Sequence, residues 1–380
     1  MTVVAAQKRR RWLLVCSVTA VLCALPAVIG AIPASAVRIA PATLAHRIAG
    51  SAAQPFQGNA VATGSVGLPV LSQLADVSKL FDGPISLRIW YASPARWRVD
   101  TLATASERDV YQGRVAGQPA QTIWDSNSSQ LTTVTGGVPA RLPRGTDVTP
   151  GDLARRLLAE AGPSTMTALP SRRVAGISAA GLRLTPNDTD TTIGTVDIWA
   201  DPRTGLPLEV AVTPVDASKP ILVSRMLEIS LHAPSTGVTT PPRPSGGIGT
   251  FRTNSGQATG VLRDLGLGPL PDTIAGLPRI DNGVYGPTGI AAYGHGFEQM
   301  IVLSLPGSTG FDVLRAAGAV GTQTKGLGGF VSATVTNPLL NVLVLHVGGS
   351  EDSVLVVGTV STDVIARAAS DLQAYESALS

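Results

Sequence analysis

The chain has 380 residues, of which 44% are apolar, 4% aromatic and 14% charged, and it contains 41 glycines and 28 prolines. This length exceeds what one hydrophobic core serves, so two domains are expected, and the glycine and proline content favours short strands and turns over long helices. The formal charge of +3 arises in residues 1–36, which hold four basic residues and no acid, so the remainder carries +3 − 4 = −1. A near-neutral body lacks the basic surface of a nucleic-acid-binding protein, and no nucleic-acid partner is expected.

Residues 1–36 have the three-part order of an export signal. Lys8 to Arg11 form a basic segment, an apolar stretch follows at 12–32, and Ala34-Ser35-Ala36 provides a cleavage motif. We predict cleavage after Ala36 and a location at the outer face of the cytoplasmic membrane or in the cell-envelope space. The apolar stretch is also long enough to span a bilayer, so an uncleaved membrane anchor with its basic end inside is the alternative.

Both cysteines, Cys16 and Cys23, lie in the apolar stretch. A lipoprotein signal needs a small residue immediately before the modified cysteine, whereas Val15 and Leu22 precede these two, so lipidation is not expected. The exported part then contains no cysteine, which excludes disulfides, thiol catalysis and cysteine metal sites. Its stability must therefore come from the hydrophobic core, as in a protein with a large sheet.

The exported part begins with a predicted amphipathic helix over 38–52 and changes to strands from Phe56. A brief helix is predicted over 70–81. Strict alternation of apolar residues over 85–91 predicts the clearest strand. The strand at 96–100 returns after a Ser-Pro-Ala turn, giving a hairpin with one apolar face and one solvent-exposed face, as is typical of antiparallel sheets.

Further strands are predicted at 123–124, 130–134, 193–200, 206–212 and 221–231. Residues 149–161 predict a helix that Thr149 caps and Gly162-Pro163 ends. In the turn at 201–205, Pro202 supplies a fixed φ and Gly205 a left-handed corner. Successive strands thus offer one apolar face to a common concave side.

A stretch rich in Pro, Gly and Thr at 233–250 is interpreted as a linker between a first domain, 37–232, and a smaller α+β domain, 251–380. The strands and helices predicted in this second domain are 288–293, 298–304, 340–347 and 353–359 for strands, and 310–319 and 362–378 for helices. The two domains are expected to fold as separate units.

Four segments resemble the LolA-like and RseB/MucB-like family of bacterial exported proteins: PFQGNAVATGSVGLP (55–69), LRIWYASPARWRV (87–99), SERDVYQG (106–113) and WADPRTGLPLEV (199–210). The resemblance covers about residues 38–231. It implies a mainly β (α+β) fold, in which an antiparallel sheet curls into an unclosed half-barrel and helices plug an apolar concave side that receives acyl chains. Residues 284–304 and 353–369 weakly resemble the second domain of RseB-like proteins, whose members sense envelope stress and restrain an anti-sigma factor.

The resemblance makes the concave face the candidate ligand site. The residues with the phase of that face are Leu87, Ile89, Trp97, Val99, Val196, Ile198, Leu208 and Val210. The core of any β-sandwich shows the same alternation, so these residues either pack only against one another or line space for a lipid or for the acyl chain of a lipoprotein. The rival function is a protein-interaction regulator of a membrane anti-sigma factor or transporter that carries no lipid.

No catalytic machinery is recognisable in the sequence. Its four histidines form no HExxH pattern, and no GxSxG or phosphate-binding glycine motif occurs, so no enzyme activity, metal or cofactor is expected. The run Tyr293–Gly296 is interpreted as a tight turn between strands, and Asn187–Asp190 as a hairpin turn in preference to a calcium loop. Glu107 and Asp109 share one side of a strand and are interpreted as a solvated face.

Overall fold

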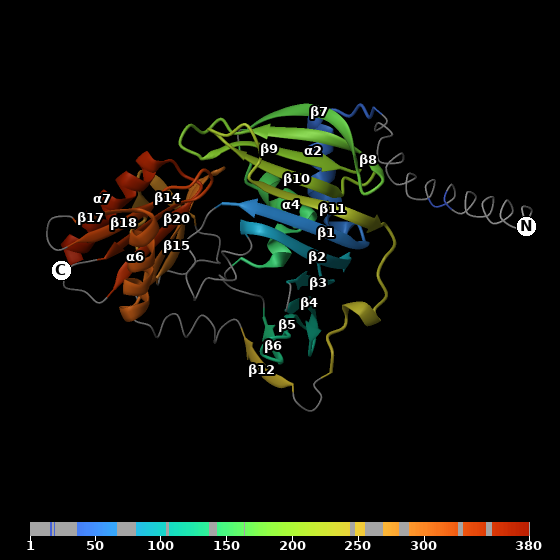
Figure 1. Ribbon diagram of the computed structural model, residues 1–380, viewed down its shortest axis with the longest axis horizontal. Coiled ribbons are helices and arrows are strands. Elements are labelled where there is room, and N and C mark those ends of the chain that lie inside the picture. Colours follow the sequence, from blue (N-terminus) through green and yellow to red (C-terminus); the bar gives the residue numbers. More distant parts are fainter. Residues whose placement is uncertain are drawn as a thin grey trace, which may run out of the picture.

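The computed structural model describes Cys16, Thr19 and residues 36–66, 81–103, 106–136, 143–162, 164–243, 248–254, 269–280, 289–325, 330–346 and 352–379. Apart from Cys16, Thr19 and Ala36, the predicted export segment lies outside these residues, as does the predicted helix over 70–81 apart from Phe81. Two sheets dominate the fold (Figure 1). None of the helices in the described part has the length and apolar character needed to cross a membrane.

The larger sheet has twelve strands in the order β12-β6-β5-β4-β3-β2-β1-β11-β10-β9-β8-β7. Its strands are β1 (Phe56–Ser65), β2 (Asp82–Ser93), β3 (Arg96–Leu102), β4 (Glu107–Val115), β5 (Gln118–Asp125), β6 (Gln130–Thr135), β7 (Thr165–Val174), β8 (Ile177–Thr185), β9 (Ile193–Ala200), β10 (Pro207–Pro214), β11 (Leu222–Ser230) and β12 (Gly249–Asn254). All neighbours are antiparallel except β12 and β6. The two edge strands, β12 and β7, do not pair with each other, so the sheet is unclosed and the predicted fold class is confirmed.

Two helices cover the concave face of this sheet, α2 (Pro41–Gly50) and α4 (Pro150–Ala159) (Figure 1). Leu44 and Ile48 of α2 and Ala154 of α4 are fully buried against β8, β9 and β10. As the sequence predicts, the Thr149 hydroxyl caps α4 by accepting a hydrogen bond from Asp152 N at 3.4 Å. Short 3₁₀ turns η1 (Ser51–Ala53) and η3 (Gly145–Val148) extend this cover.

The turn at Asp201–Gly205 fixes where α2 lies. The Asp201 carboxylate accepts hydrogen bonds from Arg203 N at 3.0 Å and from the Thr204 hydroxyl at 2.9 Å. Gly205 has φ +74°, and a Cβ there would lie 2.2 Å from the Arg47 carbonyl oxygen. The left-handed corner predicted for Gly205 is therefore confirmed, and it also lets the end of α2 approach the sheet closely.

The smaller sheet has eight strands in the order β13-β14-β15-β16-β20-β19-β18-β17, with a helix on each face. Its elements are β13 (Thr273–Ile274), β14 (Leu277–Ile280), β15 (Ile290–His295), β16 (Glu298–Leu305), α6 (Gly307–Val320), β17 (Thr322–Lys325), β18 (Val331–Val335), β19 (Asn341–His346), β20 (Ser353–Gly358) and α7 (Thr362–Leu379). In β19, Leu343 packs toward α7 while Val344 packs toward α6. The period-2 alternation of the strand thus serves a core on each side.

One boundary predicted from the sequence is wrong. Residues 251–254, assigned there to the second domain, belong with Gly249 and Thr250 to β12, which pairs in parallel with β6 at the edge of the larger sheet. The 3₁₀ turn η4 (Gly237–Thr239), within the predicted linker, packs on β3 and β4. The Pro/Gly composition of the predicted linker carries no information about which sheet the following strand joins.

The second domain also contributes to the core of the first. Phe297 and Leu339 are buried in the cluster that contains Leu44 and Val196. Backbone hydrogen bonds run across the same seam, from Thr192 N to Thr359 O at 3.0 Å and from Ser361 N to Asp190 O at 2.7 Å. Burying an aromatic side chain of this size is worth about 1.5–3 kcal/mol, so the two domains stabilise each other.

We therefore predict that a protease site placed after Pro242 yields two pieces that stay together. Both pieces should co-elute in size-exclusion chromatography after cleavage, because the seam does not depend on the covalent link. Phe297→Ser should separate them, whereas Phe311→Ser, which changes an exposed phenylalanine of α6, should not. Separation of the unmutated pieces would contradict the shared core.

Candidate functional site

The residues predicted to line the concave face are mostly buried. Leu87, Ile89, Val99, Val196, Ile198, Leu208 and Val210 each expose 5% of their surface or less, and Trp97 is half-buried. The alternation in the sequence therefore marks residues that are largely buried in the folded sheet. Their role in binding a ligand stays a prediction.

The structure divides these residues between two clusters. Val196, Ile198 and Val210 pack with α2, α4 and the second domain's Phe297. The remaining five pack around β1, β2 and η3, in a cluster that includes Val148 and Trp199. Leu208 joins this second cluster next to a shift in the pairing register of β10 between Pro207 and Glu209. A sequence pattern gives the phase of a strand but not this division, because curvature of the sheet and placement of the helices decide it.

The few polar groups in this region already have partners. The Tyr91 hydroxyl donates to Ala52 O at 2.7 Å, and burial raises its pKa. The Ser224 hydroxyl, which is fully buried, donates to Val148 O at 2.5 Å. The described part of this surface is therefore predominantly apolar.

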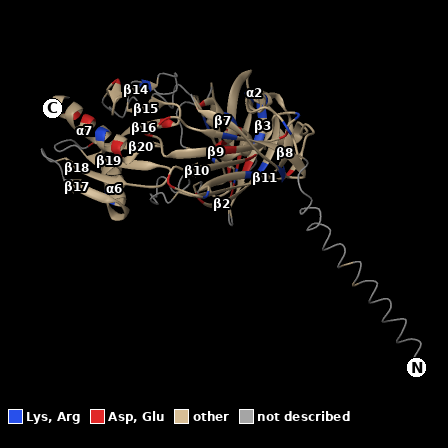
Figure 2. Ribbon diagram, turned by 90° about the horizontal axis from the view of Figure 1, so that it is seen from above, with Lys and Arg blue, Asp and Glu red and all other residues tan. Residues whose placement is uncertain are grey.

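The outer face of the same sheet carries charge. Figure 2 shows Lys, Arg, Asp and Glu interspersed over the strands of the larger sheet. On β2, β3 and β4, Arg88, Arg98, Asp100, Glu107 and Asp109 face one another across neighbouring strands. Asp100 is 0% exposed and Asp109 is 5% exposed, so the interpretation of Glu107 and Asp109 as a solvated face is wrong for Asp109.

Arg98 is the centre of this outer cluster. Its guanidinium donates to both carboxylate oxygens of Asp100, at 2.6 and 2.8 Å, and to Oδ2 of Asp109 at 2.8 Å. It also lies over the rings of Trp90 and Tyr111, at 4.8 and 5.0 Å from their centroids. The planar guanidinium can make bidentate hydrogen bonds and stack on the rings at once, which a lysine cannot do. The sequence does not predict this arrangement, because the partners of Arg98 come from three different strands.

The outer cluster holds more acid than base. Arg88 and Arg98 face three carboxylates, those of Asp100, Glu107 and Asp109. Burial, together with the negative charge of Asp100, raises the pKa of Asp109 to about 7. The cluster is charge-balanced when Asp109 holds a proton. Because arginines already neutralise the other carboxylates, the cluster is a poor metal site.

Two serine–histidine pairs occur in the described part of the chain. His346 Nδ1 lies 3.2 Å from the Ser353 hydroxyl, and His232 Nδ1 lies 3.0 Å from the Ser230 hydroxyl. Ser353 is 0% exposed and cannot reach a substrate. Neither imidazole is oriented by a carboxylate within the described ranges, which is the third group that activates such a nucleophile.

No family model matches the sequence, and no curated protein matches it. Among solved structures, the chain is similar to MucB in the MucA/MucB complex of Pseudomonas aeruginosa, with 18% identity, coverage of 87% of this chain and 97% of that chain, and a TM-score of 0.47. It is also similar to a LolA superfamily protein from Nitrosomonas europaea, with 12% identity, coverage of 54% and 99%, and a TM-score of 0.24. The two families that the sequence resembles thus recur among these structures. At such identities the likeness concerns the fold alone.

We predict that Asp109→Asn removes a pH dependence of stability. The folded protein keeps the Asp109 proton up to about pH 7, whereas the unfolded chain releases it near the ordinary value of 3.8. As the pH rises from about 4 to 7, the Asp109 carboxyl should therefore lower the free energy of unfolding of the wild type. The Asp109→Asn variant should not show this decrease. Urea unfolding at pH 5, 6, 7 and 8 measures the difference, and parallel curves for the two proteins would refute the assignment.

Proposed function

We propose that this protein binds an acyl chain of a lipid or lipoprotein at the concave face of its larger sheet, outside the cytoplasm and without catalysis, as a carrier or an envelope-signal regulator. The proposal rests on the kind of element that covers this face. Two short helices, α2 and α4, lie on it instead of a second sheet. A helix of 10 residues can shift as a unit, whereas a paired sheet cannot.

The cost of withdrawing α2 from the concave face is comparable to the gain from burying an acyl chain there. Leu44 and Ile48 fill the face under α2, and withdrawing two such side chains costs about 3–6 kcal/mol. An acyl chain regains about 0.8 kcal/mol for each buried CH₂, so about eight methylenes offset that loss. A ligand can therefore displace the helix without disturbing the strands beneath it.

The predicted export signal fits this function. Residues 1–36 direct the chain across the membrane. The remainder has a charge of −1, which does not favour binding to nucleic acid. A protein released or anchored at the outer membrane face meets lipids, acylated proteins and the exposed parts of membrane-embedded regulatory or transport proteins. These are the partners that we propose.

A second candidate is a regulator that binds a membrane protein and carries no lipid. It is favoured by the complete burial of Leu44, Ile48 and Ala154, through which the chain fills its own concave face. Native mass spectrometry of protein purified from its own membranes separates the two candidates. Co-purifying lipid supports the first, and a stable protein partner without lipid supports the second.

We predict that the wild-type protein takes up a fluorescent fatty acid and that the Val99→Trp variant does not, while the melting temperature of the variant stays within a few degrees of the wild-type value. Val99 lies on the inner face of β3 and is 5% exposed. Val61→Trp is the matched control, because Val61 lies on the outer face of β1 and should tolerate the change without effect on uptake.

Tight packing at Val99 would instead make the larger ring an overpacking error that costs about 1–3 kcal/mol. Melting temperature and probe binding are measured on the same samples. If the wild type takes up no probe and Val99→Trp only destabilises the fold, the lipid-binding function is wrong and the regulator replaces it.

A further inference from the structure

The seam between the domains brings together two turns that are far apart in the sequence. Residues 187–190 lie between β8 and β9 in the first domain, and residues 296–297 connect β15 to β16 in the second, next to His295 at the end of β15. The Thr191 hydroxyl donates to Phe297 O at 2.9 Å, and Ser361 N donates to Asp190 O at 2.7 Å. Both turns are therefore held in place by contacts from the opposite domain.

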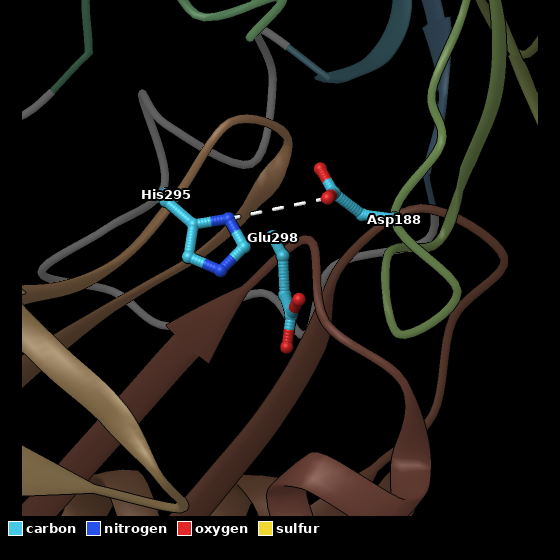
Figure 3. Close-up of side chains that lie close together, drawn as sticks. All are labelled: Asp188, His295 and Glu298. Atoms are coloured by element: carbon cyan, nitrogen blue, oxygen red, sulfur yellow. Dashed lines mark ion pairs between the residues drawn. The ribbon is translucent and has the colours of Figure 1, made fainter. Parts of the chain in front are cut away.

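Asp188, His295 and Glu298 meet at this seam (Figure 3). His295 Nδ1 lies 4.0 Å from Asp188 Oδ1, and one ligand atom from each of the three residues lies within 4.8 Å of the other two. Bonds of about 2.0–2.2 Å to a tetrahedral Zn²⁺ require ligand atoms about 3.3–3.6 Å apart. The His295 side chain is 59% exposed and can turn to close that difference.

Glu298 supplies an independent indication of a ligand. It is only 8% exposed, and within the described ranges its carboxylate has no hydrogen bond or close ion pair, although the charges of His295 and Arg367 act on it from a longer distance. Burial and the nearby charge of Asp190 raise its pKa. Buried carboxylates are normally hydrogen-bonded, paired or bound to a metal, because burial removes the water that otherwise stabilises their charge.

The charge around the three residues also favours a cation. Asp190 forms an ion pair with the guanidinium of Arg367 at 2.8 Å, and Glu160 accepts a hydrogen bond from Gln299 at 2.5 Å. Arg367 thus contacts Asp190 and acts on Glu298 only from a longer distance, and the charged partner found near Asp188 in this part of the structure is His295, at 4.0 Å. The outer cluster differs, because Arg88 and Arg98 already pair with its carboxylates.

We propose that Asp188, His295 and Glu298 bind one Zn²⁺ across the domain seam. One imidazole and two carboxylates form a donor set that zinc accepts in tetrahedral sites, with a fourth position for water. Asp188 comes from the first domain and the other two from the second, so the ion ties the domains together. This role is separate from lipid binding and does not depend on it.

The test is calorimetric titration of Zn²⁺ into the chelator-treated exported protein at pH 7.5. We expect one equivalent to bind and the melting temperature to rise with the concentration of free Zn²⁺. Asp188→Asn, His295→Asn and Glu298→Gln should each weaken binding by about tenfold or more, as loss of a ligand does, and abolish that rise. Mg²⁺ and Ca²⁺ should not substitute, because both prefer sets made only of oxygen ligands.

Two further histidines provide matched controls. His46 and His232 are exposed and lie away from the seam, so His46→Asn and His232→Asn should leave the stoichiometry and affinity unchanged. Exposed His295 tolerates replacement, which keeps the test decisive if Glu298→Gln impairs folding. Zn²⁺ should also tighten association of the two pieces cut after Pro242. The proposal is overturned if no saturable binding is seen, or if binding survives His295→Asn and Asp188→Asn.

Discussion

The apolar concave face of the larger sheet is the feature on which the rest of the molecule depends. A curved antiparallel sheet that does not close cannot bury that face against itself. Here α2, α4 and η3 lie across it, and Phe297 of the second domain completes the cover. The placement of both helices, the seam between the domains and the proposed ligand site all follow from the need to keep this face out of water.

Elements with a complete local signal were predictable from the sequence. The strand predicted at 193–200 coincides with β9, and the helix predicted at 149–161 contains α4 with its Thr149 cap. The final helix begins at Thr362 as expected. In each case the capping or turn residue and the apolar period point to the same structure, so no distant contact has to be known.

Strands β7 and β8 were not predicted, and their turn explains why. Ala175 and Gly176 have φ values of +47° and +82°, which a tight two-residue hairpin of this kind requires. Asn-Gly or Asp-Gly would have signalled such a turn, whereas alanine at a positive φ gives no such indication. Pro170 also interrupts the run of residues that forms β7. Tertiary pairing with β9 supplies what local propensity lacks.

The candidate sites show the same limit. Phase alone places Leu87 and Val196 on the inner face, but only the folded chain assigns them to different clusters. Asp109 looks solvated in the sequence because its neighbours are charged, although those neighbours bury it by pairing across strands. Asp188 lies in a turn and His295 at the end of β15, and the sequence gives no sign that the two lie 4.0 Å apart in the folded chain.

The parallel pairing of β12 with β6 sets an order of events while the chain is being made. The larger sheet is completed only by residues 249–254, which begin at the end of the Pro/Gly stretch and are synthesised after all its other strands. Until they emerge, β6 presents an unpaired strand edge to its surroundings, and such edges recruit strands from other chains. Residues 249–254 therefore protect the edge of β6, and the larger sheet stays prone to aggregation until the chain has been made as far as Asn254.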